Sequence, residues 1–177
     1  MRVVAGDARG RKLTAKLPDH VRPTKDRVRE AVFSALSSRG AIKGAAVADL
    51  YCGSGAMGIE ALSRGAASCT FVDDDPACLA AAKANLASVG LEGRDATFVR
   101  AHLPRWQPRG QVDLVLCDPP YGTLDAAAVL DAVDARLVVF ETEQPFEHPQ
   151  GWDVTLERRY GGTLVTMLLR PSDDGRP

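Results

Sequence analysis

The chain has 177 residues, of which 45% are hydrophobic and 25% charged, a composition that is typical of one globular domain and excludes a largely disordered protein. No apolar run approaches the roughly 20 residues that a membrane-spanning helix needs, and the N-terminus lacks the apolar stretch of a secretory signal. We therefore expect a cytoplasmic protein with no membrane association. The four cysteines form no C-x-x-C pair and the three histidines show no ligand spacing, so we expect buried free thiols and no metal site.

The net charge of −1 hides an uneven distribution. Residues 1–30 carry nine Lys and Arg against four Asp and Glu, whereas the other 147 residues carry thirteen against nineteen. A basic N-terminal arm on an acidic body indicates an end that faces a polyanion. A solvated basic hairpin without a partner is the alternative.

The first elements in chain order are two short strands at 2–5 and 11–15 around a Gly-containing turn, which predict a hairpin. Arg22-Pro23 then interrupts the chain, and Thr24 can cap a helix that runs to about Ser38 and ends before Gly40. Apolar residues at helical spacing predict that this helix buries one face and turns Lys25, Arg29 and Arg39 outward.

From Ala45 onward, strands and helices alternate. Strands are expected at 45–50, 68–72, 96–99, 112–117 and 136–140, and helices at 57–64, 76–89 and 124–133. This alternation predicts a doubly wound, mostly parallel α/β sheet. Two further strands, 154–159 and 163–169, flank a Gly-Gly turn and predict an antiparallel hairpin that closes the sheet. We expect a basic extension at 1–39, a main domain at 40–171 and a frayed tail at 172–177.

A glycine-rich loop follows the first strand of the main domain, with glycines at positions 53, 55 and 58. Such a loop lets the backbone approach an adenosine-containing ligand, and the Asp73-Asp74 carboxylates after the next strand can accept hydrogen bonds from a ribose. The pattern also satisfies the dinucleotide fingerprint. Asp49 favours the other interpretation, because an acid beside the loop suits the sulfonium and ammonium groups of S-adenosylmethionine better than a pyrophosphate.

The third strand leads into His102 and Leu103, which are candidates for contact with the adenine; a plain surface histidine is the equal alternative. The candidate cofactor-binding residues are Asp49, Tyr51, Gly53, Ser54, Gly55, Gly58, Asp73, Asp74, His102 and Leu103.

The tetrapeptide Asp118-Pro119-Pro120-Tyr121 leaves the strand at 112–117. Two prolines fix the backbone and remove two donors, so the Asp118 side chain and the Pro119 carbonyl can both accept hydrogen bonds from an aromatic amine. Tyr121 can stack on the base. All four residues are candidate catalytic residues for methylation of an exocyclic amine. A merely structural turn is the alternative, which the position after the fourth strand disfavours.

A base in a duplex or a folded RNA must be splayed out before it can reach such a loop, so the surrounding backbone must be held. We expect the basic arm to supply the phosphate contacts. The candidate residues are Arg2, Arg9, Arg11, Lys12, Arg22, Lys25, Arg27 and Arg29.

The chain resembles, over nearly its whole length, the bacterial 16S ribosomal RNA guanine-N2 methyltransferases of the RsmD type. The resemblance rests on segments 2–6, 10–13, 22–24, 26–30, 49–55 and 58–65, and on the tetrapeptide 118–121. It implies a seven-stranded class I methyltransferase (Rossmann-like) sheet with an N-terminal hairpin extension. It also implies transfer of a methyl group from S-adenosylmethionine to N2 of a guanine in 16S ribosomal RNA, in a partly assembled small subunit.

Two features depart from the family pattern. His102 stands where an Asp or Asn is usual, and the stretch between Phe140 and Trp152 is too short for the expected helix. We expect a monomer. The alternatives are a DNA or other RNA amino-methyltransferase, a non-catalytic RNA-binding assembly factor on the same fold and, more distantly, a dinucleotide oxidoreductase.

Overall fold

The computed structural model describes residues 1–15, 26–104, 106–120 and 122–171. Among the sequence-based predictions, the Thr24 cap and the frayed tail lie outside these residues, as do the assignments to Arg22, Lys25 and Tyr121.

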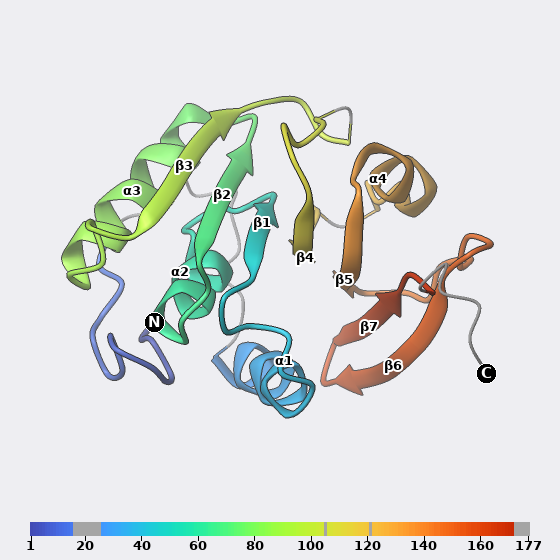
Figure 1. Cartoon of the computed structure of the whole chain (residues 1–177), viewed down its shortest axis with the longest axis horizontal. Coiled ribbons are helices and arrows are strands. Elements are labelled where there is room, and N and C mark those ends of the chain that lie inside the picture. The colour runs from blue at the N-terminus through green and yellow to red at the C-terminus, as the bar shows by residue number, and fades with distance from the viewer. Residues whose placement is uncertain (16–25, 105, 121, 172–177) are drawn as a thin grey trace.

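Seven strands form one sheet in the order β3-β2-β1-β4-β5-β7-β6 (Figure 1). Neighbours among β1 to β5 run parallel, whereas β7 is antiparallel to both β5 and β6. The predicted doubly wound sheet with a closing hairpin is confirmed. The strands are β1 (Ala46–Leu50), β2 (Ser68–Asp73), β3 (Asp95–Arg100), β4 (Val112–Cys117), β5 (Ala135–Thr142), β6 (Asp153–Tyr160) and β7 (Thr163–Leu169).

The helices lie on both faces of the sheet. Helices α1 (Asp26–Ser38), α2 (Ala56–Ser63) and α3 (Pro76–Ser88) share one apolar cluster with Leu114 and Val139, whereas α4 (Ala126–Ala132) belongs to a second cluster with Val115 and Val138. Because side chains alternate along a strand, adjacent residues of β4 and β5 feed opposite clusters. In the described stretch between β5 and β6, residues 143–152, no helix forms, as the short spacing predicted.

The N-terminal arm, residues 1–15, forms a hairpin with a single β-bridge, Arg2 to Lys12, rather than the two strands expected. The turn bonds to helix α2 instead of extending the ladder: the Asp7 N–H donates to the Ser63 carbonyl at 2.8 Å and the Ala8 N–H to the Ser63 hydroxyl at 3.0 Å. The arm therefore docks on the core, beside the C-terminal halves of α2 and α3 (Figure 1).

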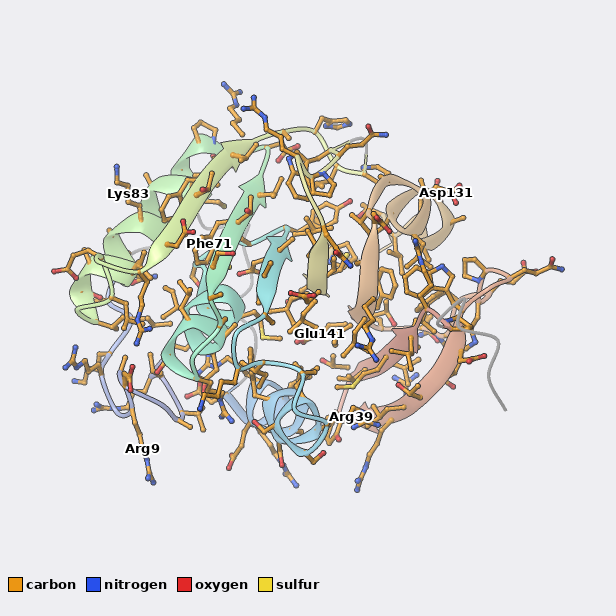
Figure 2. All side chains as sticks on the ribbon, viewed as in Figure 1. Arg9, Arg39, Phe71, Lys83, Asp131 and Glu141 are labelled. Atoms are coloured by element: carbon orange, nitrogen blue, oxygen red, sulfur yellow. The ribbon has the colours of Figure 1, made fainter. Side chains whose placement is uncertain are left out.

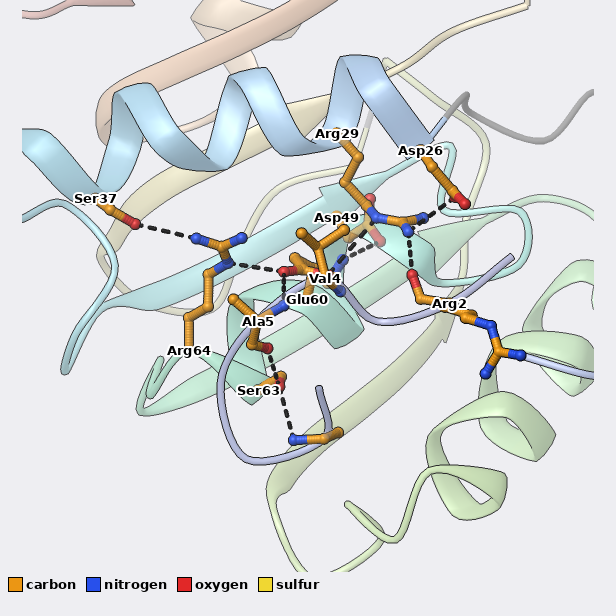
Figure 3. A network of polar contacts seen from close by, with 12 residues as sticks. Arg2, Val4, Ala5, Asp26, Arg29, Ser37, Asp49, Glu60, Ser63 and Arg64 are labelled. Carbon is orange, nitrogen blue, oxygen red and sulfur yellow. Dashed lines mark hydrogen bonds and ion pairs between the residues drawn. The ribbon is translucent and has the colours of Figure 1, made fainter. Parts of the chain in front are cut away.

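The prediction that Arg29 points outward is wrong, because its side chain is completely buried. Its Nη2 donates to the Arg2 carbonyl and, at 3.0 Å, to Asp26, and its Nε lies 3.7 Å from the buried Glu60 carboxylate (Figure 3). Arg29 thus ties α1 to the arm and to α2. None of the described helices is long and apolar enough to cross a membrane.

Candidate cosubstrate site and catalytic loop

The strand order reverses between β1 and β4, the point at which open α/β sheets bind ligands at the carboxyl ends of their strands. Leu50 pairs with Cys117 at the ends of these two strands. The glycine loop and the catalytic tetrapeptide, which follow those residues, therefore start side by side. The structure brings together the two motifs on which the sequence-based interpretation depends.

Two of the glycines are required by close packing. A Cβ on Gly58 would lie 2.4 Å from Phe71 and 2.6 Å from the Cys69 sulfur. Gly55 adopts φ 74° and precedes helix α2, and a Cβ there would lie 2.8 Å from that of Ala82. The loop therefore lies tightly against β2 and α3, with backbone N–H groups at the start of α2.

Asp49 is buried on β1 and binds the backbone that follows this loop. Its carboxylate accepts from the Gly58 N–H at 2.8 Å, which satisfies a free donor in the first turn of α2. Burial raises its pKa well above the usual range, and the charges of Asp118 and Asp73 raise it further, against the lowering effect of the Gly58 hydrogen bond. The charge of Asp118 in the candidate catalytic loop therefore acts on Asp49.

The two aspartates after β2 have different surroundings. Asp73 is buried, and its two oxygens accept from the backbone N–H groups of Gly53 at 2.9 Å and Asp75 at 3.0 Å. Asp74 is exposed, with its carboxylate 3.6 Å from Nδ1 of His102. Asp73 orders the glycine loop, whereas Asp74 and His102 are exposed and lie together at the carboxyl ends of β2 and β3.

Three further candidates surround the loop. Tyr51 has a left-handed φ of 56°, and burial, with the nearby Cys117, raises the pKa of its hydroxyl to about 12. The Ser54 carbonyl accepts from the buried Asn85 amide at 3.0 Å. Leu103 packs in the second apolar cluster.

All four cysteines are free and buried, as predicted, and burial raises the pKa of Cys52, Cys69 and Cys117.

In the catalytic loop, Asp118 is half-buried, Pro119 is buried and Pro120 is exposed. The Pro120 carbonyl accepts from the N–H of Thr123 at 3.2 Å and from its hydroxyl at 2.7 Å. These two hydrogen bonds lie directly after Asp118 and Pro119.

Sequence reasoning missed Glu141 on β5, a residue that is only 4% exposed. Burial raises its pKa well above the usual range; Asp118 and Asp49 add to the rise, and Arg29 opposes it. Within the described residues, no cluster of His, Cys, Asp and Glu is arranged to hold a metal ion.

The candidate RNA-binding residues that the structure describes divide into two groups. Arg2, Arg9, Arg11, Lys12 and Arg27 are exposed, and Arg9 points away from the body (Figure 2). Arg29 is buried and bound within the protein, so its assignment as a surface phosphate contact is wrong.

The fold and the site define a class I methyltransferase of the Rossmann-like type. The model of the family described as conserved hypothetical protein 95 matches residues 1–169. The chain is 36% identical over 185 residues to the YlbH protein of Bacillus subtilis, covering 96% of this chain and 99% of that one. It is 30% identical over 174 residues to the ribosomal RNA small subunit methyltransferase D of Haemophilus influenzae, covering 91% and 89%.

Among solved structures, the chain matches YhhF of Escherichia coli with a TM-score of 0.79 and 31% identity, over 96% of this chain and 97% of that one. The chain therefore belongs to this family, that of the RsmD-type methyltransferases.

Proposed function

We propose that the protein transfers a methyl group from S-adenosylmethionine to the N2 amine of a guanine in 16S ribosomal RNA. The observation that carries this proposal is the juxtaposition of the glycine loop with the catalytic tetrapeptide at the β1–β4 switch point. The printed name of the Haemophilus relative supports small-subunit ribosomal RNA as the substrate.

The residues that would hold the cosubstrate fit its chemistry. Bound S-adenosylmethionine supplies an electrophilic methyl group on a positively charged sulfur, beside an ammonium group. The buried Asp49 and the half-buried Asp118 place acidic groups at the loop that would receive those positive charges. Asp74 would accept hydrogen bonds from the ribose hydroxyls, and His102 or the Leu103 backbone would contact the adenine.

The catalytic loop would then act on the amine. The nitrogen lone pair of an aromatic amine is delocalised into the ring, so the amine is a weak nucleophile until hydrogen bonds draw it towards tetrahedral geometry. The Asp118 carboxylate and the Pro119 carbonyl would accept from its two N–H groups, and Tyr121 would stack on the base. Most of the rate enhancement would come from this positioning.

The substrate we propose is ribosomal RNA within a partly assembled small subunit, acted on by a monomeric enzyme in the cytoplasm. The exposed arginines and lysine of the arm would contact its phosphates.

The proposal is tested by incubating radiolabelled S-adenosylmethionine with small subunits that lack the modification, and then digesting the RNA to nucleosides. We expect the label in N2-methylguanosine. Label in adenosine or cytidine, or transfer to DNA only, would contradict the proposal. Asp118→Ala distinguishes a non-catalytic assembly factor, since an enzyme should lose turnover while still binding RNA.

A further inference from the structure

Glu141 lies inside the protein near the end of β5 (Figure 2), and its Oε1 has no hydrogen-bond partner among the described residues. A buried polar atom without a partner is costly, and native proteins retain few of them. The Nε and Nη1 atoms of Arg29, on the helix that packs over this face, likewise have no hydrogen-bond partner there. Among the described residues, the Glu141 carboxyl and the Arg29 guanidinium therefore have hydrogen-bonding capacity that is not used.

The sheet register places Glu141 beside the catalytic aspartate. Leu116 pairs with Val139 and Cys117 with Phe140, and Asp118 and Glu141 directly follow this last pair in their chains. Asp49 pairs with Leu116, two residues before Asp118. Because side chains two residues apart share a sheet face, Asp49 and Glu141 face the side covered by α1 and α2, and the charge of Asp118 acts on both.

The charged groups that face Glu141 are Arg29 from α1, Asp49 from β1 and Asp118 from the end of β4. Arg29 is shared, since it also contacts Asp26 and the buried Glu60. Asp118 and Asp49 raise the pKa of Glu141 in addition to burial, and a further positive charge nearby would favour the ionised forms of these carboxyl groups.

We propose that Glu141 exchanges a proton during the methyl-transfer cycle: it gives up its proton when the sulfonium cosubstrate binds and, with Asp118, takes one up when the amine is methylated. This inference rests on the proposed function. In the catalytic step, the nitrogen lone pair forms the N–C bond, and the C–S bond breaks with its electron pair going to sulfur. One N–H proton passes to the Asp118–Glu141 pair and later to solvent.

Glu141 acts through Asp118 and through the charge of the bound cosubstrate, so it is a positioning residue. Its role is detected by the number of protons that the protein releases when the cosubstrate binds. Binding of S-adenosylmethionine, measured by calorimetry at neutral pH in buffers of different ionisation enthalpy, should release about one proton. S-adenosylhomocysteine, which lacks the charge on sulfur, should release less. Glu141→Gln should abolish most of this release and weaken S-adenosylmethionine roughly tenfold, the effect of one pKa unit, while leaving S-adenosylhomocysteine binding nearly unchanged.

Glu143→Gln, an exposed substitution two residues further along the chain, is the matched control and should behave as the parent protein. If the parent releases no proton, or if Glu141→Gln releases as many as the parent, the inference is overturned. Should Glu141→Gln fail to fold, infrared difference spectra of the parent decide: the band of a protonated carboxyl should disappear on adding S-adenosylmethionine, and its persistence would refute the inference. If S-adenosylmethionine does not bind, the proposed function fails as well.

Discussion

Buried carboxyl groups at the site make the stability of the ligand-free protein depend on pH. The pKa values of Asp49 and Glu141 are raised in the folded state, chiefly by burial, so the folded protein holds protons that the unfolded chain releases. Their contribution is fully present below about pH 4, where the unfolded groups are protonated, and is lost as the pH rises through the folded values.

The free energy of unfolding, measured by urea denaturation across this range, should therefore carry a negative contribution to its slope against pH from these two groups. Glu141→Gln should remove part of it, whereas the exposed Glu143→Gln should not. Identical pH profiles for Glu141→Gln and the parent would show that the Glu141 pKa is not raised.

Gly58 is the residue whose replacement should disturb the cosubstrate loop most directly. Gly58→Ala forces a Cβ to within 2.4 Å of Phe71, so the loop or β2 must shift. We expect a loss of about 1–3 kcal/mol in the free energy of unfolding, as for overpacked cores, and weaker S-adenosylmethionine binding. Gly93→Ala, where no atom lies within 4 Å of the new Cβ, is the control. Equal stability of the two variants would contradict the packing account.

Single residues differ in how well the sequence predicts them. The spacing of the glycines predicts a loop in which the backbone packs closely against its neighbours. Glu141 belongs to no motif and lies near the end of an apolar strand, so only the register shows its neighbours. Arg29 shows the opposite case, because a charged side chain predicts exposure and this one is buried. The available signal was its spacing from Phe33 and Leu36, since all three lie on the buried stripe of α1.

At the level of elements, the docking of the arm depends on the buried carboxylate of Glu60 on α2. It accepts from the N–H groups of Val4 at 2.8 Å and Ala5 at 3.0 Å, and it pairs with Arg64 at 2.8 Å and with Arg29 (Figure 3). Because Arg29 would lose its buried counter-charge, Glu60→Gln should cost about 3–5 kcal/mol. Asp7→Asn, which removes an exposed pair with Arg94, should cost less than about 1 kcal/mol.

Denaturation measures both costs, and hydrogen exchange at the Val4 and Ala5 amides should accelerate only in Glu60→Gln. If these amides exchange at the parent rate, Glu60 does not anchor the arm.

Elements of the parallel sheet could be predicted to within one or two residues at most ends, because apolar strands and helices alternate clearly. The arm was predicted less well. Its strands are reduced to one bridge because the N–H groups of Val4 and Ala5 donate to Glu60, a partner more than 50 positions away that local patterns do not indicate. The same limit applies to any element whose backbone is satisfied by tertiary contacts.

Across the whole molecule, the basic arm and the catalytic loop lie at opposite ends of the parallel strands. The arm bonds to Ser63 and Val89, which adjoin the amino ends of β2 and β3, whereas the loop follows the carboxyl end of β4. Because the strands have five or six residues, their two ends are about 17–20 Å apart. An RNA that contacts both must span this distance along the protein surface.

Replacing both Arg9 and Lys12 by Glu should therefore weaken binding to folded small-subunit RNA and reduce the slope of log affinity against log salt by roughly 2, about 0.9 for each lost phosphate contact. Binding of S-adenosylmethionine should be unchanged. Arg136→Glu, an exposed charge reversal at the start of β5, is the control. An unchanged salt slope in filter-binding measurements would exclude the arm as the phosphate-binding surface.

The central claim is tested most directly by nucleoside mass spectrometry of 16S ribosomal RNA from cells that lack this protein. Re-expression of the parent, or of Asp118→Ala, completes the experiment, and we expect the variant to lose at least 10²-fold in turnover, as when a key transition-state hydrogen bond is removed. The account predicts that N2-methylguanosine falls in the deletion strain and returns with the parent but not with Asp118→Ala. Unchanged N2-methylguanosine, or the loss of a methylated adenosine or cytidine instead, would contradict it.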